Sequence, residues 1–258
     1  MIFRGLLLDL EGVLYQGDAP IPGAASALEA LRARDLAVRY LTNTTTRPRR
    51  VIAERLEGMG FAVDLEEIFT PPAAAARLLS AMAVRRLHLA AEAGLGEDFA
   101  GFEFVDAGQA DALVLGDLYR GFTWDRLNTL FQRMAEGVPL IALHKNRICR
   151  RAEGISLDLG PFVAALEYAT GVEARVVGKP SPAFFGQALD SLGLAPAEVL
   201  MVGDDIEADI GGALAAGLAA VQVKTGKYRP RDDGHPSILP TGRIGSIADL
   251  AGWLADPA

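Results

Sequence analysis

The chain has 258 residues, half of them hydrophobic and 22% charged, which suits one large α/β domain or a core carrying an inserted domain. Its net charge of −8 argues against a nucleic-acid binder, which needs a basic face, and no apolar run approaches the roughly 20 residues of a membrane span. A single cysteine, Cys149, excludes an intrachain disulfide or a cysteine metal cluster. Because the first residues also lack a signal-peptide pattern, we expect a cytoplasmic protein.

Five short apolar runs recur along the chain and predict the strands of a buried parallel sheet. Continuous apolar runs, unlike alternating ones, are typical of strands that helices cover on both faces. The five runs are Leu6–Leu10, Ala37–Leu41, Ala174–Val177, Val199–Val202 and Ala219–Val223.

Amphipathic segments between these runs predict helices with recognisable ends. Ser181 and Pro182 are typical of a helix start, as cap and first helical residue, and Gly193 is typical of its end. The alternation of strands and helices predicts a doubly wound, Rossmann-like α/β fold with a parallel sheet. The predicted helices are Pro22–Arg34, Arg49–Met59, the segment from Ser181 to Gly193, and Asp209–Ala216.

The pattern restarts between about Ala76 and Glu173, which predicts an inserted α/β domain. We therefore expect a core made of residues 1–76 and 174–258, with residues 77–173 inserted between them. The strand candidates of the insertion are Leu87–Ala91, Ala112–Leu115 and Leu140–Leu143, and its clearest helix is Thr123–Ala135.

Polar side chains end four of the five core runs, and in a parallel sheet they would share the carboxyl edge, where ligands bind. Clustered carboxylates repel one another, and Lys179 alone does not compensate for them. A hard divalent cation would compensate, and a site with only oxygen ligands favours Mg²⁺. The residues concerned are Asp9, Glu11, Thr42, Asn43, Lys179, Asp204, Asp205 and Asp209.

Such a site suits phosphoryl transfer. Mg²⁺ held by few carboxylates takes its other ligands from water and substrate phosphate. Lys179 and the hydroxyl of Thr42 can hold further phosphate oxygens, and an ionised Asp9 can attack phosphorus. We therefore expect a small phosphorylated substrate.

Four segments, in order, resemble the motifs of the haloacid dehalogenase-like hydrolase superfamily, in its subclass IIA with a large α/β cap between the second and third motifs. The tracts Gly160–Val163 and Lys224–Tyr228 are most similar to the branch of the phospholysine, phosphohistidine and inorganic pyrophosphate phosphatases. The four segments are Asp9-Leu10-Glu11-Gly12-Val13-Leu14, Leu41-Thr42-Asn43-Thr44, Gly178-Lys179-Pro180-Ser181 and Gly203-Asp204-Asp205-Ile206-Glu207-Ala208-Asp209.

The resemblance implies a role for each site residue. Asp9 would form a phosphoaspartate, and the backbone carbonyl of Glu11 and the side chain of Asp204 would complete the protein's share of the Mg²⁺ shell. Thr42 and Asn43 would bind the phosphoryl oxygens while Lys179 neutralises charge. Asp205 or Asp209 would orient metal-bound water. The resemblance also implies a homodimer formed through the caps.

Glu11 departs from the family pattern, in which an aspartate two residues after the nucleophile protonates the leaving group. Its extra methylene moves the carboxyl by more than about one ångström, and a misplacement on that scale can cost ~100-fold in rate. We therefore expect either slow turnover or a substrate with a good leaving group, such as a phosphoramidate or pyrophosphate.

Two other functions stay open. A phosphate-binding regulatory protein with weak turnover would fit Glu11, whereas a halide-releasing hydrolase would dispense with the metal and the acids of the fourth motif. A nucleotide-cofactor oxidoreductase is disfavoured because no G-x-G-x-x-G follows the first strand.

The basic stretch His144–Arg151 stands out in an acidic chain. It is either a cap loop that holds an anionic substrate or a solvated surface segment. Cys149, His88 and His235 have no partner pattern, and we interpret them as structural.

Overall fold

The computed structural model describes residues 3–151 and 154–256, which fold into two compact units. The first unit contains the described residues of Met1–Thr42, Ile52–Phe69 and Lys179–Ala258, and the second contains those of Asn43–Val51 and Thr70–Gly178. None of the helices in the described ranges combines the length and apolar character needed to cross a membrane.

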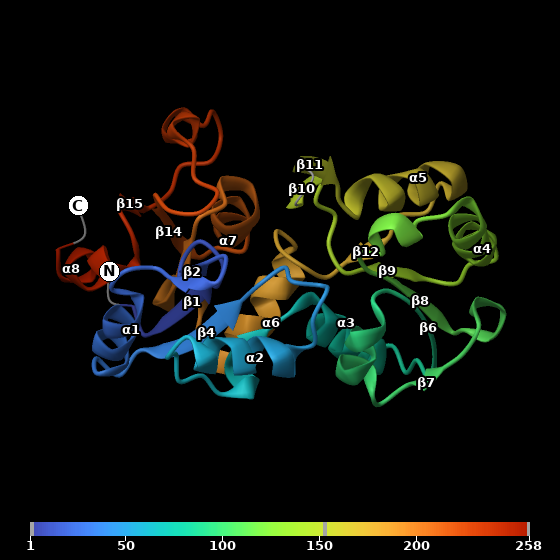
Figure 1. The fold of residues 1–258 in the computed structure, drawn as a ribbon, viewed down its shortest axis with the longest axis horizontal. Helices are drawn as coiled ribbons and strands as arrows, with labels where there is room; N and C mark the ends of the chain where they lie inside the picture. The colour runs from blue at the N-terminus through green and yellow to red at the C-terminus, as the bar shows by residue number, and fades with distance from the viewer. Residues whose placement is uncertain (1–2, 152–153, 257–258) are drawn as a thin grey trace. The chain divides into compact units, whose positions relative to one another are not determined.

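A six-stranded parallel sheet forms the first unit, in the order β15-β14-β13-β1-β4-β5 (Figure 1). The first strand of the chain lies inside the sheet, where Leu6 is opposite both Leu200 of β13 and Val38 of β4. The strands are β1 (Gly5–Asp9), β4 (Ala37–Leu41), β5 (Ile68–Phe69), β13 (Val199–Gly203), β14 (Ala219–Val223) and β15 (Gly242–Ile244); the hairpin β2 (Tyr15–Gln16) and β3 (Ala19–Pro20) follows β1.

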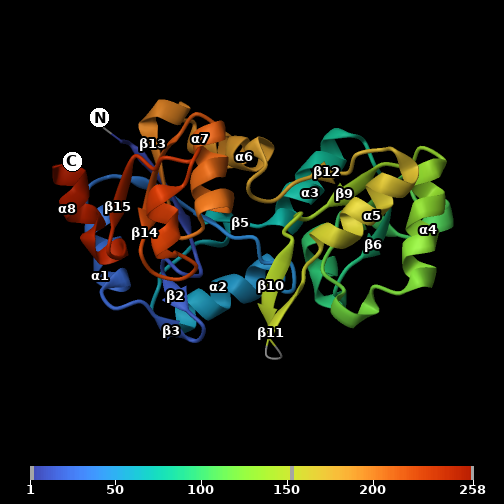
Figure 2. The same ribbon diagram turned by 90° about the horizontal axis from the view of Figure 1, so that it is seen from above.

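Helices cover both faces of this sheet. Figure 2 shows α1 and α2 on one side and α6 and α7 on the other. Leu6 and Leu8 belong to a buried cluster with Leu28 of α1 and Ile52 of α2, while Leu7 between them is also fully buried. Burial on both faces explains why the strand is continuously apolar. The helices are α1 (Ala24–Arg32), α2 (Arg49–Gly58), α6 (Pro182–Leu192), α7 (Gly212–Ala215) and α8 (Leu250–Ala255).

The predicted doubly wound parallel fold is confirmed, with four of the apolar runs forming β1, β4, β13 and β14. Helix α6 starts at Pro182 after Ser181 and ends at Gly193, whose φ of 63° is left-handed. The hydroxyl of Ser181 makes no capping hydrogen bond, so the proline, not the serine side chain, marks this start.

The second unit is built on a five-stranded parallel sheet in the order β12-β9-β8-β6-β7. Helix α3 lies on one face, and α4 and α5 lie on the other (Figures 1 and 2). The strands are β6 (Arg86–Ala90), β7 (Glu103–Phe104), β8 (Ala112–Leu115), β9 (Leu140–Ala142) and β12 (Arg175–Val176), with an antiparallel hairpin of β10 (Ile148–Arg151) and β11 (Gly154–Leu157); the helices are α3 (Pro71–Ala81), α4 (Trp124–Ala135) and α5 (Gly160–Thr170).

The assignment of the run Ala174–Val177 to the core sheet is wrong. Its strand, β12, pairs with β9 in the five-stranded sheet. A continuous apolar run indicates a strand that is buried on both faces. Because both sheets bury their strands, the run alone does not indicate which sheet it joins.

The division between the units also falls at other residues than the predicted boundaries at 76 and 174. Helix α3 is continuous across residue 76, and it begins after Thr70, whose hydroxyl accepts the N–H of Ala73. The chain returns to the first unit at Lys179.

The basic stretch His144–Arg151 pairs much of its charge within the second unit. Lys145 Nζ lies 2.5 Å from Glu167 Oε2, and Arg151 Nη2 lies 2.6 Å from Asp117 Oδ2. His144 is only 3% exposed and contacts Thr45, with 3.4 Å between Nε2 and Oγ1. These contacts hold this part of the chain in place.

Candidate active site

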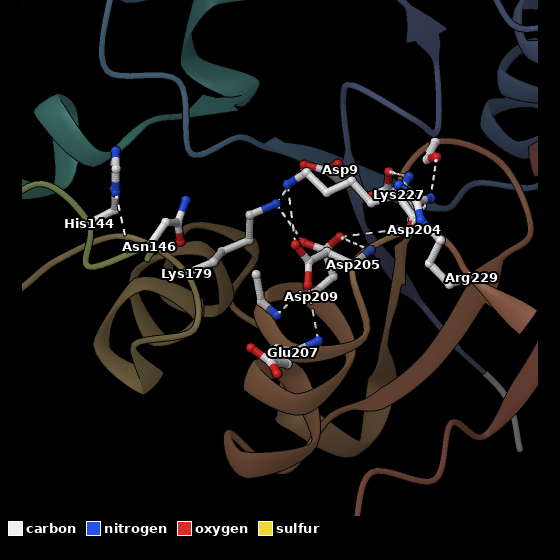
Figure 3. Close-up of polar contacts among 12 residues, drawn as sticks. Asp9, His144, Asn146, Lys179, Asp204, Asp205, Glu207, Asp209, Lys227 and Arg229 are labelled. Carbon is white, nitrogen blue, oxygen red and sulfur yellow. Dashed lines mark hydrogen bonds and ion pairs between the residues drawn. The ribbon is translucent and has the colours of Figure 1, made fainter. Parts of the chain in front are cut away.

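Three acidic side chains meet at the carboxyl edge of the six-stranded sheet (Figure 3). Asp9 is the last residue of β1, Asp204 directly follows β13, and Asp209 lies in the π-helical turn Ile206–Gly211. One carboxylate oxygen from each lies within 4.8 Å of the others, and all three residues are buried. The parallel strands thus bring together residues that are almost 200 positions apart in the chain.

Lys179 bridges two of these carboxylates. Its Nζ donates to Asp9 Oδ1 at 2.5 Å and to Asp209 Oδ1 at 2.6 Å, and the residue is 3% exposed. Burial lowers the pKa of Lys179, but the charges of Asp209 and Asp9 outweigh burial and raise it overall. The side chain is therefore a permanent ammonium ion.

Asp209 organises the polypeptide around the site. Its second oxygen, Oδ2, accepts the backbone N–H groups of Asp204 and Asp205, each at 3.1 Å. A side chain at Gly203 would collide with this carboxylate. Since both oxygens of Asp209 are engaged, we interpret it as a residue that orients Lys179 and the 204–205 backbone.

Asp205 turns away from the other carboxylates to cap the π-helical turn. Its Oδ1 accepts the N–H groups of Glu207 and Ala208, both at 3.0 Å. Its Oδ2 lies 3.2 Å from Lys227 Nζ. An acidic cap at the start of a helical turn is favoured by the unpaired N–H groups there.

The negative charge of Asp9 and Asp204 is only partly compensated by the neighbouring lysines. Burial, followed by the charge of Asp209, raises the pKa of Asp9 to about 6 in spite of Lys179. Burial, followed by the charges of Asp9 and Asp209, raises the pKa of Asp204 to about 8. One buried ammonium ion does not neutralise three buried carboxylates, so the cluster favours binding of a cation.

Asp204 has one oxygen fixed and one open. Oδ2 accepts the backbone N–H of Lys227 at 2.6 Å. Gly12 and Gly226 pack directly against this oxygen, and a side chain at either position would collide with it. Both glycines have left-handed φ values, 94° and 61°. Oδ1 is buried and has no hydrogen-bond partner in the described part of the chain. An orphaned carboxylate oxygen beside Asp9 fits a hard divalent cation.

The loop Lys224–Tyr228 contributes contacts that the sequence analysis did not assign to the site. Besides the Lys227 amide, the hydroxyl of Thr225 donates to the carbonyl of Gly12 at 2.5 Å. Burial lowers the pKa of Lys227, but Asp205 and the other nearby carboxylates raise it overall. The position of this loop directly after the apolar run Ala219–Val223, at the same sheet edge, is the signal that would have found it.

The other predicted residues are placed as follows. Thr42 is buried directly after β4, whose Leu41 is opposite Asp9. Glu11 is exposed, and its carboxylate has no hydrogen-bond partner among the residues that the structure describes. Asn43 belongs to the second unit, where its Oδ1 lies against Gly178, 2.8 Å from where a Cβ on that glycine would stand.

Gly226→Ala tests the close packing around Asp204, with Gly17→Ala as the matched control. Both glycines have left-handed φ values, 61° and 56°, but nothing lies within 4 Å of a Cβ at Gly17. We expect Gly17→Ala to lower the free energy of unfolding by about 1 kcal/mol. Gly226→Ala should lower the free energy of unfolding by roughly 1–3 kcal/mol more than that, because its methyl group overpacks the space beside Asp204. Equal urea midpoints for the two variants would contradict the steric argument.

Comparisons with known proteins identify the family. A family model described as haloacid dehalogenase-like hydrolase matches residues 6–105, and a second, HAD-hydrolase-like model matches residues 176–250. The cattle (Bos taurus) haloacid dehalogenase-like hydrolase domain-containing protein 2 is 43% identical over 230 residues, covering 89% of this chain and 87% of that protein. The cattle phospholysine phosphohistidine inorganic pyrophosphate phosphatase is 39% identical over 261 residues, covering 99% and 95%.

Solved structures agree with this assignment. The p-nitrophenyl phosphatase from Archaeoglobus fulgidus superposes with a TM-score of 0.91 at 29% identity, covering 98% of this chain and 99% of that one. NagD from E. coli superposes with a TM-score of 0.86 at 25% identity, covering 96% and 98%. The chain therefore belongs to the haloacid dehalogenase-like hydrolases, among the phosphatases of that family.

Proposed function

We propose that this phosphatase is Mg²⁺-dependent and forms a phosphoaspartate on Asp9, with a phosphomonoester, phosphoramidate or pyrophosphate as substrate. The observation that carries the proposal is the orphaned oxygen of Asp204 beside Asp9 at the sheet edge. Asp204 Oδ1 is buried and has no hydrogen-bond partner in the described part of the chain, and Asp9 is bonded to Lys179 through Oδ1. Asp204 could thus help to hold a cation while the Asp9 carboxylate acts as nucleophile.

The cation would be held by the side chains of Asp9 and Asp204 and by the backbone carbonyl of Glu11. When bound, it would neutralise the carboxylates and the phosphoryl oxygens, which otherwise repel one another. Asp205 and Asp209, whose oxygens are engaged by N–H groups and lysines, would keep Asp204 and Lys179 in place.

The reaction would proceed in two displacements. Asp9 Oδ2 attacks phosphorus, the bond from phosphorus to the leaving group breaks, and the Glu11 carboxyl gives its proton to the leaving atom. Water then attacks the phosphoaspartate, Glu11 takes up a proton from it, and inorganic phosphate leaves with Asp9 restored. Lys179 keeps Asp9 ionised and balances charge on the phosphoryl group, which Thr42 and Asn43 would also bind.

We assign the second unit to the role of the cap, which excludes water during the reaction. The names of the relatives support small substrates, because they are phosphatases of p-nitrophenyl phosphate, of inorganic pyrophosphate and of phosphorylated lysine and histidine.

Asp9→Asn should abolish hydrolysis of p-nitrophenyl phosphate, because the amide is not a nucleophile at phosphorus. The matched control is Asp190→Asn, which makes the same change at an exposed position on α6 and should leave the rate unchanged. Release of p-nitrophenol with added MgCl₂ or with excess EDTA measures both the rate and its metal dependence. Turnover by Asp9→Asn at the parent rate, or turnover that EDTA does not reduce, would refute the proposal.

Glu11→Asp should raise kcat on substrates with poor leaving groups. The shorter side chain would bring the carboxyl back to the position that the family uses, and a gain of up to ~100-fold is expected. Rates with an alkyl phosphate and with p-nitrophenyl phosphate separate the effects, since a good leaving group needs little protonation. If Glu11→Asp is slower on both substrates, Glu11 is already well placed.

Thermal unfolding should depend jointly on pH and metal. The pKa values of Asp9 and Asp204 rise from the ordinary 3.8 to about 6 and about 8, so the folded protein holds protons that the unfolded chain has lost. Without metal, this contribution makes stability fall as the pH rises from about 4 to about 8. MgCl₂ should then raise Tm more at about pH 8 than at about pH 6, because fewer protons compete for Asp204.

Asp204→Asn should remove most of the rise in Tm that MgCl₂ causes, at about pH 6 and at about pH 8. Calorimetry of the parent and the variant, with and without MgCl₂, measures it. If the rise in Tm caused by MgCl₂ does not change with pH, or persists in Asp204→Asn, the cation binds elsewhere.

A further inference from the structure

The second unit contains a pocket of about 310 Å³ that the proposed reaction does not use. All its lining residues belong to the second unit. Its lining comes from Ala90 at the end of β6, from Ala91 just beyond it, and from the start of α4. Leu118 and Leu130 add apolar surface. The volume lies at the lower end of the range of small-molecule sites.

The strand order places this pocket at a topological switch point. In the five-stranded sheet, β7 lies on one side of β6 and β8 on the other, so the connections that leave these strands diverge. In doubly wound parallel sheets, ligands bind beyond the carboxyl ends of the strands at such a point. The pocket includes Ala91, just beyond β6, and Leu118, just beyond β8.

His88 lines this pocket and has one ring nitrogen without a partner in residues 3–151 and 154–256. Its Nδ1 lies 3.1 Å from the carbonyl oxygen of Val105, and a carbonyl only accepts, so Nδ1 carries the proton. In the neutral ring, Nε2 is then a bare acceptor, and no second hydrogen bond of this ring occurs among the described residues. The histidine is therefore oriented by one nitrogen and open at the other.

The first turns of α4 add further acceptors. Thr129 donates its hydroxyl proton to the carbonyl of Asp125 at 2.8 Å, which leaves the hydroxyl oxygen as an acceptor. The Asp125 carboxylate has no hydrogen-bond partner within the described ranges. Arg126 donates from Nη1 to the carbonyl of Gly121 at 3.2 Å and has further N–H groups.

This lining selects the chemistry of a ligand. Three acceptors call for a molecule with several N–H or O–H donors, and the apolar walls call for a flat hydrophobic body. Asp125 and Arg126 bring one negative and one positive charge to the lining, a balance that suits an uncharged molecule. We propose that the pocket binds an uncharged nucleoside, with its base between Leu118 and Leu130, an amino group donating to His88 and ribose hydroxyls donating to Asp125. A carboxylate that binds ribose hydroxyls is a familiar element of nucleotide sites at switch points.

Isothermal titration of the full-length protein with adenosine and with cytidine tests the proposal. We expect one site per chain, and His88→Phe and Asp125→Asn should each weaken binding at least ~10-fold by removing an acceptor. Thr129→Val, which keeps the shape of the side chain, is a second test that does not change charge. Asp190→Asn repeats the Asp125 change on the first unit and should bind as the parent does.

Titration in the presence of saturating inorganic phosphate separates this pocket from the phosphatase site. Affinity for the nucleoside should be unchanged by phosphate and by Asp9→Asn. Absence of binding at millimolar nucleoside would overturn the proposal. So would displacement by phosphate, or parent-like affinity in His88→Phe, Asp125→Asn and Thr129→Val. None of these results bears on whether Asp9 is the nucleophile.

Discussion

The contact of Lys179 with two buried carboxylates is the constraint on which the rest of the site depends. Taking a charge out of water costs several kcal/mol unless it is paired and hydrogen-bonded, and Lys179 is paired with both Asp9 and Asp209. Asp9 is thereby fixed on one oxygen, and Asp209 is oriented so that its other oxygen receives two backbone N–H groups. The ammonium ion thus connects β1 with the turn after β13, and the conformation of that turn follows from it.

The same arrangement leaves negative charge in excess, and the protein directs that excess to one place. Asp204 is held by its side chain and by its backbone, because Gln222 donates to its carbonyl at 3.2 Å and, from the same nitrogen, to Asp232 Oδ2 at 3.2 Å. The Lys227 amide occupies the other carboxylate oxygen. Of the hydrogen-bonding atoms of Asp204, Oδ1 alone is then left open among the described contacts, and such fixing would lower the reorganisation that the proposed cation binding needs.

Local sequence patterns predicted much of this structure, and the reasons for the misses are physical. Apolar runs revealed β1 and β13 because both are buried on both faces, and the acids that follow them indicated the site. The short edge strands β5 and β15 carry too few residues to show a pattern. Strand β12 was placed in the wrong sheet because pairing partners are not encoded in one run.

The misses at functional positions have a related origin. The Lys227 contact with Asp204 uses a backbone N–H, which every residue except proline has, so no residue type marks it. His88 was interpreted as structural because a lone histidine has no partner pattern, and the binding role proposed for it above stays a prediction. Its surroundings depend on the order of β7, β6 and β8 in the sheet, and this is a property of the whole unit. Side-chain chemistry at strand ends can thus be read from the sequence, whereas surroundings that depend on strand order cannot.

The position of β1 inside the sheet has a consequence for how the chain is made. One edge of β1 pairs with β4, which is synthesised soon after it, but the other edge pairs with β13, about 190 residues later. During translation the apolar segment Gly5–Asp9 therefore has an unpaired edge until β13 has left the ribosome. Early helices that pack on this strand would protect that edge, and the carboxylates at the ends of β1 and β13 meet only after the residues between them have been made.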